Sequence, residues 1–424
     1  MRFKVFKNTV LFFLLLAIAC ASKTKNETSS TEAMENKVSS TSDFENDDKD
    51  IIVGANQTKA YLPFLKGKRI GIVANQTTVI FTNSENHKTE TRPFVHLVDS
   101  LLKHNIDIKK VFAPEHGFRG KADAGEDVKD GVDTKTGLPI FSLHGKHKKP
   151  TNEQLSDLDL MVFDIQDVGV RFYTYISTLH YVMEACAENN VPLLILDRPN
   201  PNGNYVDGPV LEKKHSSFLG MHPIPLVHGM TIGEYAKMIN GEHWLKGGVT
   251  CDISIIELKN YNHNRNYSLM IRPSPNLPND QAIKLYPSLG LFEGTNINAG
   301  RGTEFQFQRY GAPFLNKDYY TFSYTPAPNF GSKYPKHKHT LCYGMDLSKE
   351  DSERSFTLKY IIDAYNHSTD KTKFFVTNNF TKHAGTERLQ KQIENGLSEE
   401  EIKSTWQEDL NAYKTMRSQY LIYD

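Results

Sequence analysis

Apolar residues between positions 69 and 197 follow two alternating patterns. Short runs rich in Val, Ile and Leu, typical of strands buried on both faces, occur at 69–75, 109–113, 138–143, 159–165 and 192–197. Helical spacing of apolar residues predicts helices over 92–105 and 174–190, the first with an apolar face made of Phe94, Leu97, Val98, Leu101 and Leu102. Strands that alternate with helices predict an α/β fold, in which helices cover both faces of a mostly parallel sheet.

The pattern changes beyond about residue 260. Turn-rich stretches such as "RPSPNLP" and "PSLGLFEGTNINAGRG" are followed by helical patterns at 354–366 and 385–418. The chain of 424 residues is long enough for two domains with buried cores. We therefore expect a first domain over 51–270 and a smaller α+β domain over 271–424.

The N-terminus has the pattern of an export signal. Arg2, Lys4 and Lys7 precede an apolar run and small residues that end at Cys20. The run is too short for a comfortable membrane span, and "LAIAC" is typical of a lipoprotein cleavage site, at which Cys20 becomes the lipidated first residue. The alternative is an ordinary signal peptide with an incidental cysteine. Residues 21–50 lack apolar periodicity, which predicts a disordered tether.

Charge and cysteine content exclude several classes of protein. Lys and Arg together number 50, as do Asp and Glu, so no net field would draw the chain to nucleic acid. Cys186, Cys251 and Cys342 are widely spaced and form no C-x-x-C pair, so neither a disulfide framework nor a zinc site is predicted. The chain also lacks G-x-S-x-G, H-E-x-x-H and the glycine-rich phosphate motifs. No cofactor or metal is predicted.

Polar residues follow the predicted strands at their carboxyl ends, where ligands bind in open parallel sheets. These residues are Asn75, then Glu115, His116 and Arg119, then Asp164 and Asp167, then Asp197 and Arg198. Several strands thus deliver carboxylates to one rim of the sheet.

Glu115 lies in "FAPEHGFRG", where Pro114 ends a strand and Gly117 and Gly120 permit backbone conformations closed to other residues. A carboxyl beside Pro114 and Phe118 suits a general acid, because partial burial raises its pKa. The alternative is that Glu115 only forms an ion pair with Arg119.

Two further clusters carry candidate groups. Asp164, Asp167, Arg171, Tyr173 and Tyr175 lie within 164–178, and aromatic rings beside carboxylates and an arginine suit a sugar. The alternative for this cluster is helix capping by Asp167 with the tyrosines in the core.

The second cluster, within 292–303, offers Glu293, Asn296 and Arg301 among several glycines. Taken together, the residues indicate either a carboxylate-dependent hydrolase of sugars or a sugar-binding lipoprotein without catalysis.

Eight stretches in order between about 70 and 305 carry a resemblance to a known family. They are "GIVANQT", "FAPEHGFRG", "ADAGEDVKDGVDTKTGLPIFSL", "DIQDVGVRFYTYISTL", "LDRPNPNG", "PIPLVHGMTIGEYA", "PSPNLP" and "LFEGTNINAGRGTEF". With these stretches the chain resembles the NamZ-type exo-β-N-acetylmuramidases, a glycoside hydrolase family formerly described as a domain of unknown function. The resemblance implies a Rossmann-like domain, a smaller C-terminal domain, and a cleft between them that releases N-acetylmuramic acid from the non-reducing end of peptidoglycan fragments.

The resemblance also implies roles for the candidate residues. Glu115, in the "PEHG" motif, would be the catalytic acid. Glycoside hydrolysis normally uses a second carboxylate, for which the candidates are Asp167, Asp164, Glu126 and Glu293, although the acetamido group of the substrate could replace it.

The remaining expected roles concern the substrate. Arg171 or Arg301 would bind the lactyl carboxylate and Arg119 would orient Glu115. The other residues expected to contact substrate are Asn75, His116, Tyr173 and Asn296. The open alternatives are a non-catalytic lipoprotein that binds muropeptide sugars, and an enzyme that acts on another acidic amino sugar.

Overall fold

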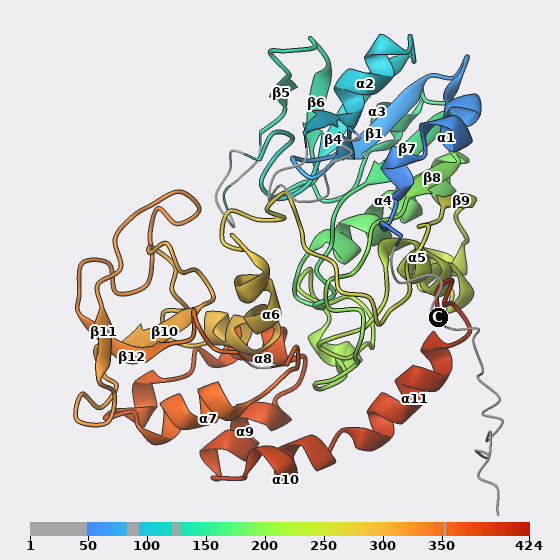
Figure 1. Cartoon of the computed structure of the whole chain (residues 1–424). Helices are drawn as coiled ribbons and strands as arrows, with labels where there is room; N and C mark the ends of the chain where they lie inside the picture. The colour runs from blue at the N-terminus through green and yellow to red at the C-terminus, as the bar shows by residue number, and fades with distance from the viewer. Residues whose placement is uncertain (1–48, 83–92, 121–125, 127–128, 352) are drawn as a thin grey trace, which may run out of the picture. The chain divides into compact units, whose positions relative to one another are not determined.

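A seven-stranded sheet forms the first part of the described chain (Figure 1). The structure is a computed structural model that describes residues 49–82, 93–120, 126, 129–351 and 353–424. The strand order is β5-β6-β4-β1-β7-β8-β9, and every neighbouring pair is parallel except β5 with β6. The strands are β1 Ile70–Ala74, β4 Ile108–Ala113, β5 Gly131–Val132, β6 Pro139–Ser142, β7 Leu160–Asp164, β8 Leu193–Leu196 and β9 Ile253–Ile256.

Helices cover both faces of this sheet, as the alternation of patterns predicts. Val73 and Phe163 belong to one core cluster together with residues of α3 Asn152–Leu155, α4 Tyr175–Asn189 and α5 Ile232–Gly241. Ile72 and Val162, which alternate with them along the strands, belong to a second cluster with residues of α1 Thr58–Leu65 and α2 Leu97–Lys103. The α/β fold class is confirmed.

The helix predicted over 92–105 is correct only in its second half. Phe94–His96 form a short strand, β3, which pairs antiparallel with β2 Val79–Phe81. The helix begins at Leu97, and His96 caps it by accepting a hydrogen bond at Nδ1 from the Val98 N–H at 3.3 Å. Phe94, which was expected on the apolar face of the helix, lies in β3 instead and is 53% exposed.

Antiparallel strands and helices make up the smaller second part, as the α+β prediction requires (Figure 1). The strands are β10 Arg309–Ala312, β11 Phe322–Tyr324 and β12 Cys342–Asp346, in the order β10-β12-β11. The helices are α6 Asp280–Leu289, α7 Lys359–Asn366, α8 Thr377–Ala384, α9 Arg388–Glu394, α10 Glu399–Ser404 and α11 Gln407–Arg417.

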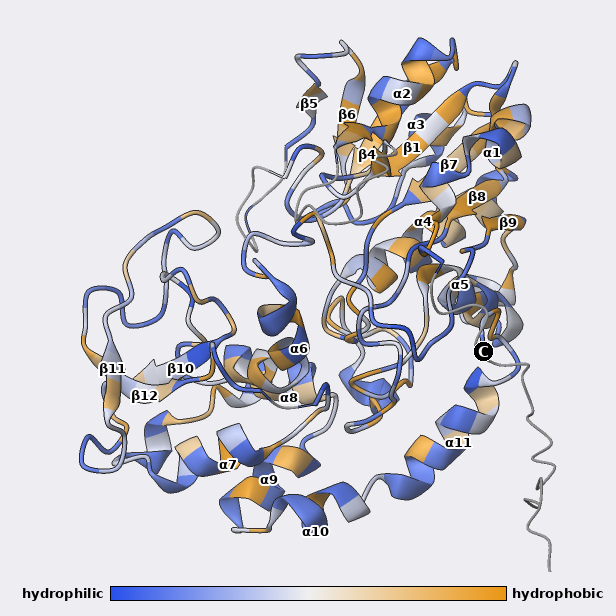
Figure 2. Cartoon of the chain, viewed as in Figure 1, coloured by the Kyte–Doolittle hydropathy of each residue, from blue (hydrophilic) through white to orange (hydrophobic). Residues whose placement is uncertain are grey.

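One hydrophobic core runs through both parts. Leu179 and Leu226 share a cluster of buried residues with Phe292, Phe380 and Leu410. Figure 2 shows hydrophobic residues concentrated on the strands of the large sheet, whereas α10 and α11 carry mainly hydrophilic residues. Lys49–Asp424 form one compact unit, so the boundary at residue 270 stays a prediction.

The C-terminal residues bind back to the first part of the chain. The Tyr423 hydroxyl donates a hydrogen bond to Asp197 Oδ2 at 2.8 Å, and the main-chain N–H of Ile422 donates one to Glu234 Oε1 at 3.0 Å. Asp197 and Glu234 are both fully buried. The end of the chain therefore completes the polar contacts at the end of β8 and the start of α5.

No helix within 49–82 or the later described ranges is long and apolar enough to cross a membrane. The predicted export signal, Cys20 and most of the predicted tether lie outside the described residues.

Candidate active site

Glu115 lies at the carboxyl end of β4, on a loop whose shape is set by its backbone. Pro114 follows the last strand residue, and His116, Gly117 and Gly120 all have positive φ angles, of 73°, 75° and 69°. A non-glycine residue such as His116 rarely adopts this conformation, and such residues concentrate at functional sites. Thr174, just before α4, donates a hydrogen bond from its hydroxyl to Glu115 Oε2 at 2.9 Å. The Glu115 carboxyl is therefore held by both loop shape and a side-chain contact.

Glu115 opens onto a cavity of about 280 Å³, which we call the catalytic cavity. Residues of the sheet domain and residues of the second part both line it. The lining residues include Glu115, His116, Tyr173, Thr174, Asn276, Tyr286, Glu293, Arg301 and His383. Of the candidate carboxylates, the cavity brings Glu293 together with Glu115.

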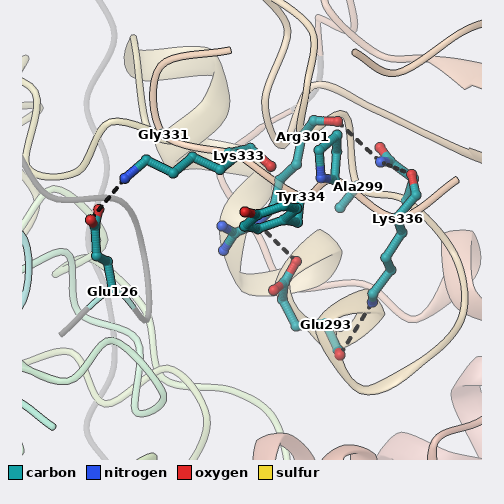
Figure 3. Close-up of a pocket in the computed structure, with 11 residues that line it drawn as sticks. Glu126, Glu293, Ala299, Arg301, Gly331, Lys333, Tyr334 and Lys336 are labelled. Carbon is teal, nitrogen blue, oxygen red and sulfur yellow. Dashed lines mark hydrogen bonds and ion pairs between the residues drawn. The ribbon is translucent and has the colours of Figure 1, made fainter. Parts of the chain in front are cut away.

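Glu293 is held in its charged form. Its Oε1 accepts a hydrogen bond from Arg301 Nε at 3.1 Å, visible in Figure 3. Burial alone would raise the pKa of Glu293, but the positive charges of Arg301 and Lys336 outweigh burial and hold that pKa below its ordinary value. Glu293 is consequently a carboxylate at neutral pH.

His383 and Tyr286 present further polar groups to the catalytic cavity. His383 Nδ1 lies 2.8 Å from the Asn379 carbonyl and donates to it, which leaves the lone pair on Nε2. Burial lowers the pKa of His383, so the imidazole is neutral at pH 7. Burial raises the pKa of Tyr286, and the charges of Glu293 and Glu115 add to this, so its hydroxyl keeps its proton. The cavity therefore offers both an acceptor and a donor to a polar ligand.

Arg171 does not line the catalytic cavity, which corrects its expected role as a ligand of the lactyl carboxylate. Its side chain is fully buried. Nη1 and Nη2 donate to four main-chain carbonyls at 2.7–3.0 Å, those of Pro209, Ile224, His383 and Ala384. Burial lowers the pKa of the guanidinium to about 9, which still leaves it charged at pH 7. Arg171 thus joins the sheet domain to the end of α8.

Arg119 does not orient Glu115, and the alternative of a simple Glu115–Arg119 ion pair is equally unsupported. The Arg119 guanidinium donates to Asp133 Oδ2 at 2.8 Å and to Asp99 Oδ1 at 3.1 Å. Its contacts hold the loop that follows Glu115 against α2.

Three other predicted residues are buried and do not line the catalytic cavity. Asp164 is fully buried and forms an ion pair with Arg198 at 2.5 Å, so it does not contact a ligand. Asn75 is fully buried and donates to the Tyr175 hydroxyl at 2.9 Å. Asp167 is 5% exposed, accepts the Gly169 N–H at 2.6 Å, and does not line the catalytic cavity. The position of Asp167 therefore favours Glu293 as the partner of Glu115.

The remaining predicted residues divide between the cavities and the surface. His116 and Tyr173 line the catalytic cavity, and the Tyr173 hydroxyl donates to the Pro273 carbonyl at 2.7 Å. Glu126 lines a neighbouring cavity and pairs with Lys333 at 2.8 Å. Asn296 lines neither cavity and donates from its side chain to the Lys373 carbonyl at 2.7 Å.

Two domain models of one protein family match this chain. The model of the N-terminal domain of the exo-β-N-acetylmuramidase NamZ matches residues 70–281, and the model of its C-terminal domain matches residues 284–423. The chain belongs to the NamZ exo-β-N-acetylmuramidase family. In this NamZ-family chain, Glu115 and Thr174 lie in the segment matched by the first model, and Glu293, Arg301 and His383 lie in the segment matched by the second.

Relatives of known name or structure agree over most of the chain. The peptidoglycan β-N-acetylmuramidase NamZ of Bacillus subtilis (strain 168) is 40% identical over 386 residues, which cover 86% of this chain and 89% of that protein. A DUF1343 family protein from Bacteroides fragilis NCTC 9343 is 45% identical, with a TM-score of 0.79 over 89% of this chain and 99% of its own. A second such protein from the same organism is 28% identical, with a TM-score of 0.74 over 88% of this chain and 99% of its own.

Several residues of the catalytic cavity were not expected from the sequence. Thr174 lies in the stretch "DIQDVGVRFYTYISTL" and Asn276 in "PSPNLP", so both could have been predicted from the sequence. Tyr286 and His383 lie in helices whose sequence carries no motif, so only the fold brings them to Glu115. Within the described ranges, no group of three or more His, Cys, Asp or Glu side chains could hold a metal ion.

The contacts of Arg171 lead to a prediction about stability. Arg171→Met should lower the free energy of unfolding by about 3 kcal/mol or more, because the lost guanidinium leaves buried carbonyls without donors and each such group costs about 1–3 kcal/mol. Urea denaturation would measure the change. Arg388→Met, which removes a guanidinium whose side chain is 55% exposed, should change the same quantity by about 1 kcal/mol or less. Equal losses in the two variants would refute the special role of Arg171.

Proposed function

We propose that this protein is a glycoside hydrolase that releases N-acetylmuramic acid from the non-reducing end of peptidoglycan fragments, in cell-wall turnover or recycling. One observation carries the proposal. In a chain of the NamZ family, Glu115 and the charged Glu293 line the same cavity, and Arg301 lines it beside them. Two carboxyl groups that flank one sugar-sized cavity are the normal equipment of a glycoside hydrolase.

Glu115 is the proposed acid. Its carboxyl would donate a proton to the glycosidic oxygen as the bond from that oxygen to the anomeric carbon breaks, so the leaving sugar departs as a neutral alcohol. The Thr174 hydroxyl, 2.9 Å from Oε2, keeps the carboxyl in place during this transfer. Water then adds to the anomeric carbon as a hydroxyl group, a carboxylate of the site takes up the proton that the water loses, and proton exchange with solvent restores the acid form of Glu115.

Glu293 is the proposed second carboxylate. Its negative charge, maintained by Arg301 and Lys336, would stabilise the positive charge that develops on the sugar ring or accept a proton from the attacking water. Arg301 uses Nε for Glu293, and its terminal nitrogens remain suited to a second anion. We propose that this second anion is the lactyl carboxylate of N-acetylmuramic acid.

A test of the acid uses Glu115→Gln. The amide keeps the shape of the side chain but is far too weak an acid to protonate the glycosidic oxygen, so turnover should fall at least about 100-fold. Purified protein from Ile51 onward would be incubated with the β-linked disaccharide of N-acetylmuramic acid and N-acetylglucosamine, and released N-acetylmuramic acid measured by mass spectrometry. Glu408→Gln, an exposed position on α11, is the matched control and should retain full activity.

Two outcomes would contradict these proposals. If the folded wild-type protein binds the disaccharide but leaves it intact, the protein is a sugar-binding lipoprotein instead of a hydrolase. If Glu115→Gln turns over normally while its circular dichroism is unchanged, another group is the acid.

A second test concerns Arg301. Arg301→Met should lower kcat/KM for an aryl β-N-acetylmuramoside about 10- to 100-fold, because the lactyl carboxylate loses a charge-assisted hydrogen bond. The corresponding N-acetylglucosaminide, which lacks the lactyl group, should be affected less, because it loses only the support that Arg301 gives to the charge of Glu293. Arg301→Lys keeps the charge and should retain part of the discrimination. A variant that still separates the two glycosides as sharply as the wild type would remove Arg301 from this role.

We also propose that the protein is exported and anchored to a membrane through a lipid on Cys20, facing the periplasm or the cell surface. The basic start, apolar run and "LAIAC" sequence support this proposal. Cys20→Ser in the full chain should move the protein from the membrane fraction to the soluble fraction. A wild-type chain that carries no acyl group by mass spectrometry would instead indicate an ordinary signal peptide.

A further inference from the structure

Two cysteines that are far apart in the sequence meet in the core of the sheet domain. Cys186 lies in the last turn of α4, and Cys251 stands two residues before β9. They are 0% and 4% exposed, and both belong to the hydrophobic cluster that contains residues of α4 and α5. Their spacing predicts no disulfide, yet the fold brings the two side chains together.

Main-chain contacts account for this proximity. Leu193 of β8 and Ile253 of β9 are partners in the parallel sheet, whose strands lie about 4.8 Å apart. Val191 and Cys251 each stand two residues before this pair. The Val191 N–H donates a hydrogen bond to the Cys186 carbonyl at 3.0 Å. The end of α4 is thereby tied to the segment that leads into β8, next to the segment that carries Cys251.

The main chain of Cys251 is held in place by α5. Asn240 donates from Nδ2 to the Cys251 carbonyl at 2.8 Å, and its Oδ1 accepts the Cys251 N–H at 3.0 Å. The position of the Cys251 side chain is therefore fixed from a second helix.

The two thiol groups contact each other. The Cys251 thiol donates to the Asp252 carbonyl at 3.8 Å, which leaves the lone pairs of its sulfur available to the Cys186 thiol. A hydrogen bond with Cys251, together with burial, raises the pKa of the Cys186 thiol well above its ordinary value. In the reduced, folded protein Cys186 consequently keeps its proton and is a poor nucleophile.

We propose that Cys186 and Cys251 form a disulfide when the chain folds in an oxidising compartment. This inference rests on the proposed export of the protein, because thiols stay reduced in the cytosol and are oxidised in the periplasm and at the cell surface. The oxidant is a disulfide donor, such as a thiol oxidoreductase or oxidised glutathione. Both S–H bonds break, the S–S bond forms, and the two sulfur atoms of the donor receive the two electrons and two protons and leave as thiols.

Burial determines when this exchange takes place. Neither thiol is accessible to a donor in the folded protein, so the bond forms while the chain is still folding. Once formed, it is shielded from reductants for the same reason.

The disulfide would close a loop that contains groups used around the active site. Residues 187–250 include Pro209 and Ile224, whose carbonyls accept hydrogen bonds from Arg171, and Leu219, which lines the catalytic cavity. A cross-link between the ends of this loop restricts the conformations of the unfolded chain. The oxidised protein should therefore resist unfolding more strongly than the reduced protein.

The first measurement identifies the bond in the full chain, purified from the membrane fraction of cells that export it. Free thiols would be alkylated with N-ethylmaleimide in urea, the protein reduced, and the new thiols alkylated with iodoacetamide. Mass spectrometry should find only the second label on Cys186 and Cys251, and their two peptides joined in an unreduced digest. Cys342, which lies on β12 and donates its thiol to the Thr340 carbonyl at 3.5 Å, should carry the first label and is the internal control.

Thermal unfolding separates the effect of the disulfide from the packing of the two side chains. Wild-type protein refolded with dithiothreitol should melt about 5 °C or more below the oxidised protein, because the cross-link is absent. Cys186→Ala should melt at one temperature in both preparations, whatever the cost of the substitution itself. The matched control, Cys342→Ala, should keep the full difference between them.

Three outcomes would overturn the inference. Exported protein, recognised by the loss of its signal peptide, contains no disulfide if Cys186 and Cys251 both carry the first label. A bond from either residue to Cys342 would contradict the pairing. If the chain is not exported, refolding the reduced chain with reduced and oxidised glutathione decides the question: a bond between Cys186 and Cys251 supports the inference although the export proposal fails, and free thiols refute the inference as well.

Discussion

The charge of Arg171 is the constraint on which the rest of the structure depends. A fully buried guanidinium is costly unless its N–H groups find acceptors, and here main-chain carbonyls from three separate segments accept hydrogen bonds from Nη1 and Nη2, while Nε has no partner among the described residues. Two of these carbonyls belong to His383 and Ala384 at the end of α8. Gly385 follows with φ +76°, and a side chain there would begin 2.6 Å from Arg171 Nη2. The need of this buried charge for hydrogen-bond acceptors therefore determines how the end of α8 packs against the sheet domain. His383, at this junction, lines the catalytic cavity.

The two glutamates of that cavity have different surroundings, and the difference supports different roles. Glu293 lies beside Arg301 and Lys336, whose charges keep it ionised despite burial. Glu115 accepts a hydrogen bond from the neutral Thr174 hydroxyl, while Arg119 turns away toward Asp99 and Asp133. Arg301 thus pairs with Glu293, whereas Arg119 pairs with carboxylates other than Glu115. Pairs of titratable groups with contrasting environments are the usual means by which one site supplies both an acid and an anion.

The sequence predicts much of the sheet but little of the contact between the two parts. Strands such as β1 and β7 were predictable because their apolar runs reflect burial on both faces, a local property. Glu115 was predictable because a strand end, a proline and glycines stand next to it in the chain. The contacts of Arg171 were not, since its carbonyl partner in Ala384 lies 213 residues away and any residue type supplies a carbonyl. Asp164 and Asn75 were misplaced for a related reason: a strand end specifies the edge of the sheet, but only packing decides which polar side chains face outward and which satisfy buried partners.

The contacts of the C-terminal residues bear on the order in which the protein is made. Tyr423 and Ile422 bind Asp197 and Glu234, which precede them by about half the chain. Domains commonly fold as units during synthesis, the N-terminal one first. Here the polar network at the end of β8 gains these two partners only after residues that lie 226 and 188 positions further along the chain have been synthesised. The sheet domain therefore cannot complete this network on its own, and its final packing waits for the second part of the chain.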